Sequence, residues 1–176
     1  MSDSRKIPRQ SVTVRRIGPE FHDWILGINA ANVPEVGSMD HAGLMERLAM
    51  PHWLGAAFMG DRPVGVLLGM REGAAYRSPN YLWFNQRYDR FIYVDRIMID
   101  EAARGLGAGR ALYDRFVEDF ADDAQWLFCE VNTLPPNPRS LRFHDSLGMM
   151  KISDLVHVPG EKAVAMLGRC LRSRDG

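Results

Sequence analysis

The order of apolar and polar positions along the first 50 residues predicts one strand followed by two helices. Alternation over 11–17 is typical of a short strand. Apolar residues recur at helical spacing after Pro19, and this pattern breaks at 33–37. Asp40 is suited to cap a second helix, which we expect to end before Pro51.

The rest of the chain predicts further strands, with two helices among them. Short apolar runs separated by Gly and Pro predict strands at 53–59, 63–70, 91–99, 126–131, 149–158 and 163–171. Helical patterns follow the glycine cluster at 104–109 and the proline-rich segment at 135–138. Residues 71–90 are expected to form a long aromatic connection. We therefore predict an α/β fold with a mixed central sheet of about six to seven strands and about four helices.

The chain of 176 residues is expected to form a single domain over 11–176, preceded by a flexible N-terminal arm over 1–10. Composition limits the classes of partner that the protein can bind. Acidic and basic residues balance at 22 each, so no overall positive field favours nucleic acid or an anionic membrane. Cys129 and Cys170 lie in apolar runs and are expected to be buried thiols. The polar start and the lack of a long apolar run lead us to expect a cytoplasmic protein.

The most informative segment is the glycine cluster between the strand at 91–99 and the next helix. Alternating glycines allow the backbone to turn sharply and to approach a ligand closely. The first amides of the helix lack intrahelical partners, so they can bind a phosphate or pyrophosphate. A dinucleotide fingerprint needs Gly or Ala where this chain has Arg110 or Leu112, and no Gly-Lys-Ser/Thr triphosphate loop is present.

The cluster fits Arg/Gln-x-x-Gly-x-Gly/Ala and resembles the acetyl-coenzyme A signature of the GNAT N-acetyltransferase superfamily. The order of elements over 11–171 is also similar to that of the GNAT fold. A second motif, over 137–149, resembles the family's later Asn-containing helix. It departs from the family where His144 replaces the usual tyrosine and Met149 replaces the final aromatic residue. The stretch from Cys129 to Gly148 further resembles an uncharacterised subgroup of predicted GNAT acetyltransferases.

The resemblance implies acetyl-coenzyme A (acetyl-CoA) as co-substrate. The strand at 97–99 would splay from its neighbour, so that its backbone amides contact the thioester and pantetheine arm. The glycine loop would hold the pyrophosphate. Arg110 would add a charge or simply be solvated. The expected cofactor-binding residues are Ile97, Met98, Ile99, Arg104, Gly105, Leu106, Gly107, Ala108, Gly109, Arg110, Asn137 and Ser140.

Three residues are candidates for proton transfer during attack by an amine. His144, in the tyrosine position, would act as the acid or merely pack against the helix. Glu130 lies in an apolar strand, where an unpaired carboxylate is costly. It would serve as base, as amine anchor, or as partner of Arg96 or Arg142. Asp95 invites the same argument, and its alternative is again an ion pair with an arginine.

The resemblance implies an acceptor site that involves the 71–90 connection and the first two helices. Asn132, which shares a strand face with Glu130 by two-residue alternation, is also expected there. Tyr81 and Trp83 would wall a pocket for a small amine, or belong to the core or to a lid. His41 and His52 have no metal-ligand spacing, so no metal is expected.

The implied function is acetyl-CoA-dependent transfer of an acetyl group, by direct attack, to a primary amine of a small molecule, amino acid or peptide. One alternative keeps the chemistry but takes a protein N-terminus or lysine as acceptor. The other is a non-catalytic acyl-CoA-binding or sensor module. We expect no nucleic acid or membrane partner, and the sequence leaves a homodimer open.

Overall fold

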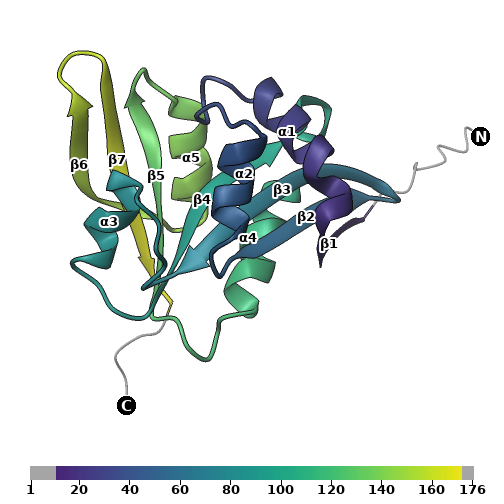
Figure 1. Ribbon diagram of the computed structural model, residues 1–176, viewed down its shortest axis with the longest axis horizontal. Coiled ribbons are helices and arrows are strands. Elements are labelled where there is room, and N and C mark those ends of the chain that lie inside the picture. Colours follow the sequence, from purple (N-terminus) through teal and green to yellow (C-terminus); the bar gives the residue numbers. More distant parts are fainter. Residues whose placement is uncertain (1–10, 172–176) are drawn as a thin grey trace, which may run out of the picture.

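The computed structural model describes residues 11–171, so the arm predicted over 1–10 lies outside the described residues. Its centre is a seven-stranded mixed sheet in the order β1-β2-β3-β4-β5-β7-β6 (Figure 1). The strands are β1 (Val12–Arg16), β2 (Trp53–Met59), β3 (Arg62–Arg71), β4 (Phe91–Ile99), β5 (Trp126–Leu134), β6 (Met150–Val158) and β7 (Lys162–Cys170). The predicted α/β class and the strand count are confirmed.

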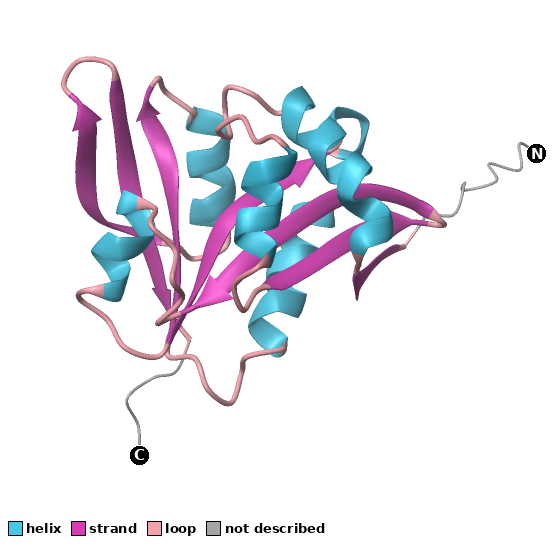
Figure 2. Cartoon of the chain, viewed as in Figure 1, coloured by secondary structure: helices cyan, strands magenta, loops and turns pink. Residues whose placement is uncertain are grey.

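Helices cover both faces of the sheet (Figure 2). They are α1 (His22–Ala31), α2 (His41–Leu48), α3 (Pro79–Asn85), α4 (Ala108–Glu118) and α5 (Pro138–Ser146), with short 3₁₀ turns at η1 (Pro19–Phe21) and η2 (Glu101–Ala103). Side chains of α4 and α5 pack into the largest apolar cluster, on one face. Helices α1 and α2 pack on the other face through a second cluster, and α3 packs there through a third.

Helix α3 corrects the expectation that 71–90 is an irregular connection. Pro79 occupies its first turn, where a missing N–H costs nothing. Tyr81 and Phe84 are fully buried, and the Phe84 ring stacks on Phe128 with 4.3 Å between centroids. The helix has only seven residues, so its stability must come from this aromatic packing rather than from its own length.

The two cysteines differ in their surroundings. Cys129 is buried beneath α4, as expected, whereas Cys170 is exposed. The prediction of a buried thiol at Cys170 is therefore wrong. This residue is the last of β7, and its position at the end of the strand leaves it exposed. In the part of the chain that the structure describes, no helix is long and apolar enough to span a membrane.

Strands β4 and β5 pair for only three residues and then separate. Phe91, Ile92 and Tyr93 pair in parallel with Trp126, Leu127 and Phe128. Beyond Tyr93 the pairing of β4 with β3 contains a bulge at Asp95, while β5 remains paired with β7 as far as Leu134. The edge of β4 that faces β5 is thus left unpaired from Val94 onward, and Figure 1 shows the two strands diverging. This is the splay that the resemblance implied.

Candidate functional site

The glycine loop leads from β4 into α4 through two left-handed residues, Gly105 (φ 74°) and Gly107 (φ 93°). Gly107 is the N-cap of α4, and the first helical hydrogen bond runs from Ala111 N to Gly107 O at 3.0 Å. The amides of 108–110 therefore have no intrahelical acceptor. A Cβ built on Gly105 or Gly107 would meet no atom within 4 Å, so both glycines border open space. The loop has the backbone geometry of an anion cradle.

The third glycine has a different role. A Cβ at Gly109 would lie 2.9 Å from the Phe143 ring, so the missing side chain lets α4 approach α5. Of the neighbouring residues in the loop, Ala108 is buried and Leu106 is 53% exposed.

The two arginines of the loop turn toward other elements. Arg104 donates to Asn32 Oδ1 (3.3 Å) and lies 3.7 Å from the Glu101 carboxylate. Arg110 is exposed and donates to the Ser146 carbonyl at 2.8 Å, at the end of α5. Arg110 is thus exposed to solvent and is also hydrogen-bonded to the end of α5.

The end of β4 offers backbone rather than side chains to the splay. Met98 is buried under α1 and α2, whereas Ile97 and Ile99 pack against the cluster below α4. At the start of α5, Asn137 Oδ1 caps the helix by accepting from Ser140 N (3.1 Å). The Ser140 carbonyl and hydroxyl both face the His144 ring.

His144 is buried, with 3% of its surface exposed, and both ring nitrogens have partners. Its Nδ1 donates to the Ser140 carbonyl at 2.7 Å, so Nε2 is the acceptor for the Tyr113 hydroxyl at 2.8 Å. Burial lowers the pKa of His144, although the Ser140 carbonyl opposes that shift. The ring is neutral and both of its nitrogens are hydrogen-bonded, which favours the alternative that His144 only packs against the helix. The role of His144 as an acid stays a prediction.

Glu130 is half-buried on β5, facing away from α4, whereas its neighbours Cys129 and Val131 pack beneath that helix. Its carboxylate accepts a hydrogen bond of 2.7 Å from the Tyr93 hydroxyl. Burial raises the pKa of Glu130 to about 7, despite opposing interactions with Tyr93 and Asn80. Among residues 11–171, no arginine, lysine or histidine forms an ion pair with this carboxylate. The expected alternative of an arginine partner is not what the structure shows.

Asp95 instead forms the ion pair that was its alternative. Its Oδ2 lies 2.9 Å from both Arg47 Nε and Arg96 Nε, and its Oδ1 accepts from the Tyr76 hydroxyl at 2.5 Å. Burial alone would raise the pKa of Asp95, but Arg96 and Arg47 outweigh it and the pKa falls below its ordinary value. Since Arg96 also donates to Asn29 on α1, the cluster joins α1, α2 and β4.

The predicted acceptor residues separate into core and surface. Tyr81 is fully buried, accepts from Ala74 N and donates to Arg71 O, which is the core alternative. Trp83 is half-buried, with the Arg87 guanidinium 4.4 Å from its ring. Asn132 is on the same strand face as Glu130, as expected, and donates to the Glu35 carbonyl at 3.4 Å.

Two contacts of Glu130 were missed by sequence reasoning. Tyr93 shares with Phe91 the β4 face that meets α3, so alternation could have placed it on the same face of the sheet as Glu130. Asn80 had no sequence signal, because its approach to Glu130 depends on α3 folding back over the sheet.

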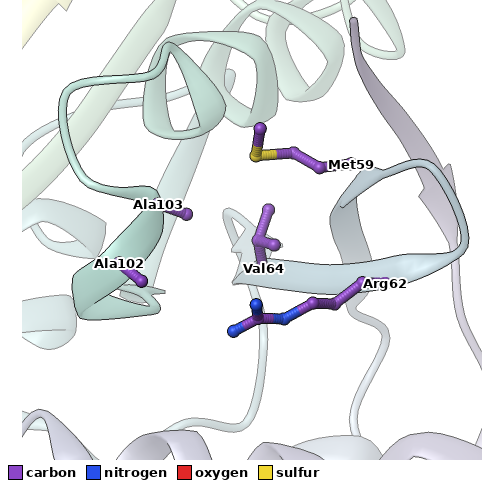
Figure 3. Close-up of a pocket in the computed structure, with 5 residues that line it drawn as sticks. All are labelled: Met59, Arg62, Val64, Ala102 and Ala103. Carbon is purple, nitrogen blue, oxygen red and sulfur yellow. The ribbon is translucent and has the colours of Figure 1, made fainter. Parts of the chain in front are cut away.

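A small pocket lies apart from these groups, between the β2–β3 turn and η2 (Figure 3). Its lining residues are Met59, Arg62, Val64, Ala102 and Ala103. Arg62 also pairs with Asp100 at 2.5 Å. None of the predicted site residues lines this pocket. Within the described range 11–171, no group of three or more His, Cys, Asp or Glu side chains is placed to hold a metal ion.

Comparison with known proteins identifies the family. The model of the acetyltransferase (GNAT) family matches residues 21–149. The chain belongs to the GNAT family. No curated protein matches the chain in sequence.

Solved structures show the same fold at low identity. Ard1 from Thermoplasma volcanium is 18% identical, with a TM-score of 0.72 over 92% of this chain and 99% of that one. The Escherichia coli ribosomal-protein-S18-alanine N-acetyltransferase is 10% identical (TM-score 0.70; 94% and 97% covered). Salmonella typhimurium yncA, solved with its cofactor acetyl-CoA, is 14% identical (TM-score 0.68; 94% and 97% covered).

Proposed function

We propose that this GNAT protein is an N-acetyltransferase that uses acetyl-CoA to acetylate a primary amine of a small molecule, amino acid or peptide. The observation that carries the proposal is Glu130. It is a carboxylate without an ion-pair partner in the described chain, its pKa is raised to about 7, and it lies on β5 where β4 has turned away. A sensor module would have no need for a base poised near neutral pH.

The residues present fit acetyl-CoA. The left-handed glycines border open space, and the α4 amides of 108–110 supply hydrogen-bond donors for a pyrophosphate. The unpaired edge of β4 after Tyr93 offers further amides for an extended arm, and Asn137 and Ser140 lie at the start of α5. When bound, acetyl-CoA supplies the activated acetyl thioester.

Glu130 prepares the amine for attack. An ammonium ion is attracted to the carboxylate and loses a proton to it, directly or through a water. The neutral nitrogen would then form the N–C bond as the C–S bond breaks, with the electron pair of that bond passing to sulfur. The nitrogen would lose its second proton, which would protonate the sulfur and leave an amide and free coenzyme A thiol. A base whose pKa is close to the operating pH is efficient because a substantial fraction is ionised at that pH and the ionised form readily accepts a proton. The Tyr93 hydroxyl keeps one carboxylate oxygen oriented.

The test measures cofactor binding and turnover separately. Acetyl-CoA affinity is measured by calorimetry, and release of free coenzyme A thiol is followed with a panel of primary amines. We expect Glu130→Gln to lower turnover by about a hundredfold with the acetyl-CoA dissociation constant nearly unchanged. Glu118→Gln, at an exposed residue of α4, is the matched control.

Each result has a distinct meaning. Acetyl-CoA binding without thiol release for any amine would favour the sensor alternative. A Glu130→Gln variant with parental turnover would remove Glu130 from the reaction. Efficient acetylation of protein termini or lysines, with no small amine accepted, would move the acceptor to the protein class.

A further inference from the structure

Helix α3 brings a polar side chain to the same face of the sheet as Glu130. The helix is anchored by Phe84 on Phe128 and by Tyr81 against Tyr93, with 5.3 Å between the latter ring centroids. Phe128 and Tyr93 are the last residues of the β4–β5 pairing before the strands separate. Asn80, in the first turn of α3, is therefore held at the start of the splay.

The Asn80 amide is oriented from its other side by His157 on β6. His157 Nε2 lies 2.7 Å from Asn80 Oδ1 and donates to it. An amide has one acceptor oxygen and one donor NH2 group, so fixing the oxygen on His157 directs the NH2 group away from β6. The same side chain interacts with the Glu130 carboxylate, for which an NH2 group is the matching partner.

We propose that Asn80 and His157 are positioning residues for Glu130: His157 fixes the Asn80 amide, and Asn80 donates to the carboxylate and keeps it aligned beside the splay. Tyr93 supplies the second donor at 2.7 Å, so the carboxylate is held from β4 and from α3. The role of Glu130 as a base rests on the proposed function, whereas the hydrogen-bond chain that holds its carboxylate does not.

The hydrogen bond donated by Asn80, among the groups that surround Glu130 and His157, determines the direction in which the pKa of Glu130 should change. Glu130 is faced by Tyr93 from β4, and Asp95 of the same strand acts on it electrostatically. Tyr113 of α4 interacts with Glu130 only across the sheet, and His157 interacts with Lys162 of β7. Because Asn80 donates to the ionised carboxylate, its removal disfavours that form and raises the pKa of Glu130. We expect an upward shift of about one pH unit, typical of losing one hydrogen bond to a charged group.

The experiment titrates Glu130 directly and needs no acceptor. The protein is labelled with ¹³C at Glu side-chain carboxyls, and the Glu130 signal is assigned by its loss in Glu130→Gln. Asn80→Ala and His157→Leu are expected to shift the titration midpoint upward. His157→Gln, whose amide can still donate to Asn80, should remain close to the parent.

The control is Asn85→Ala, at the other end of α3, where the side chain accepts from Gly73 N at 2.8 Å. This change perturbs the same helix without touching Glu130, so the midpoint should not move. His157→Leu leaves the sequence of α3 intact, which keeps the test decisive if Asn80→Ala folds poorly.

Unchanged midpoints in both Asn80→Ala and His157→Leu would overturn the proposal, as would an equal shift in Asn85→Ala. The proposed function fails on a different result, namely acetyl-CoA binding without thiol release for any amine. The NMR outcome does not depend on that measurement.

Discussion

Replacing Asp95 with asparagine tests whether this carboxylate is structural or catalytic. Asp95 is 5% exposed in its side chain, and its partners Arg47 and Arg96 are 17% and 7% exposed. The asparagine leaves both guanidinium groups with no counterion at this position. Breaking a buried pair by removing one partner costs about 3–5 kcal/mol. For a chain of this length that corresponds to a fall in Tm of about 6–20 °C.

The pH dependence gives a second, independent signature. The folded-state pKa of Asp95 is lowered, so the stabilisation is present above the unfolded value of about 3.9 and is lost as the pH falls through the folded pKa. The stability difference between parent and Asp95→Asn should therefore be constant near neutrality and shrink under strongly acidic conditions.

Thermal and urea unfolding of both proteins measure this difference. The control is Asp154→Asn, whose ion pair with Lys151 has both side chains more than half exposed and is worth about 0–1 kcal/mol. An Asp95→Asn variant with the parental Tm and a hundredfold lower turnover would refute the structural interpretation and restore the catalytic one.

Three further predictions concern the loop, the buried histidine and the pH profile. Gly107→Ala places a side chain at φ 93°, so calorimetry should show weaker acetyl-CoA binding, whereas Gly27→Ala, with open space and a helical backbone, should bind as the parent does. His144→Ala removes a buried ring and the acceptor of the Tyr113 hydroxyl, so unfolding should show a loss of about 2–4 kcal/mol, and a hundredfold lower turnover of the folded protein would instead support the acid role. The rate profile of kcat/KM should fall below a pH of about 7 as Glu130 becomes protonated, and Glu130→Gln should lack this limb.

Local patterns were sufficient for most of the fold. Alternation and apolar runs predict the strands because most of them bury one or both faces, and the hairpin at Gly60–Arg62 follows from its turn residues. Asp40 caps α2 as predicted, its carboxylate accepting from Gly43 N at 2.8 Å. The glycine loop is equally local, since the left-handed backbone at Gly105 and Gly107 is a property of a few adjacent residues.

Contacts between distant segments could not be predicted in the same way. Apolar spacing along the sequence does not predict helix α3, because the helix is short and its aromatic residues pack against side chains of β4 and β5. The pairing of His144 with Tyr113 joins residues 31 positions apart on two helices. The approach of Asn80 to Glu130 likewise requires the folded sheet. A sequence can flag a costly buried group, but its partner depends on the tertiary fold.

Asp95 and Glu130 show how such partners divide roles between two similar acids. Both lie in largely apolar strands, where desolvation acts to raise the pKa of each carboxyl group; ion pairs outweigh it at Asp95 but not at Glu130. Arg47 and Arg96 both bind Asp95, which stays ionised and ties two helices to β4. Among residues 11–171 Glu130 has hydrogen-bond partners but no ion-pair partner, and burial raises its pKa to about 7. Environments that separate the pKa values of two carboxyl groups in this way are typical of sites where one acid is structural and the other exchanges protons. The arginine cluster around Asp95 therefore contributes to the proposed chemistry indirectly, because it keeps Asp95 ionised and the charge of Asp95 adds to the raised pKa of Glu130.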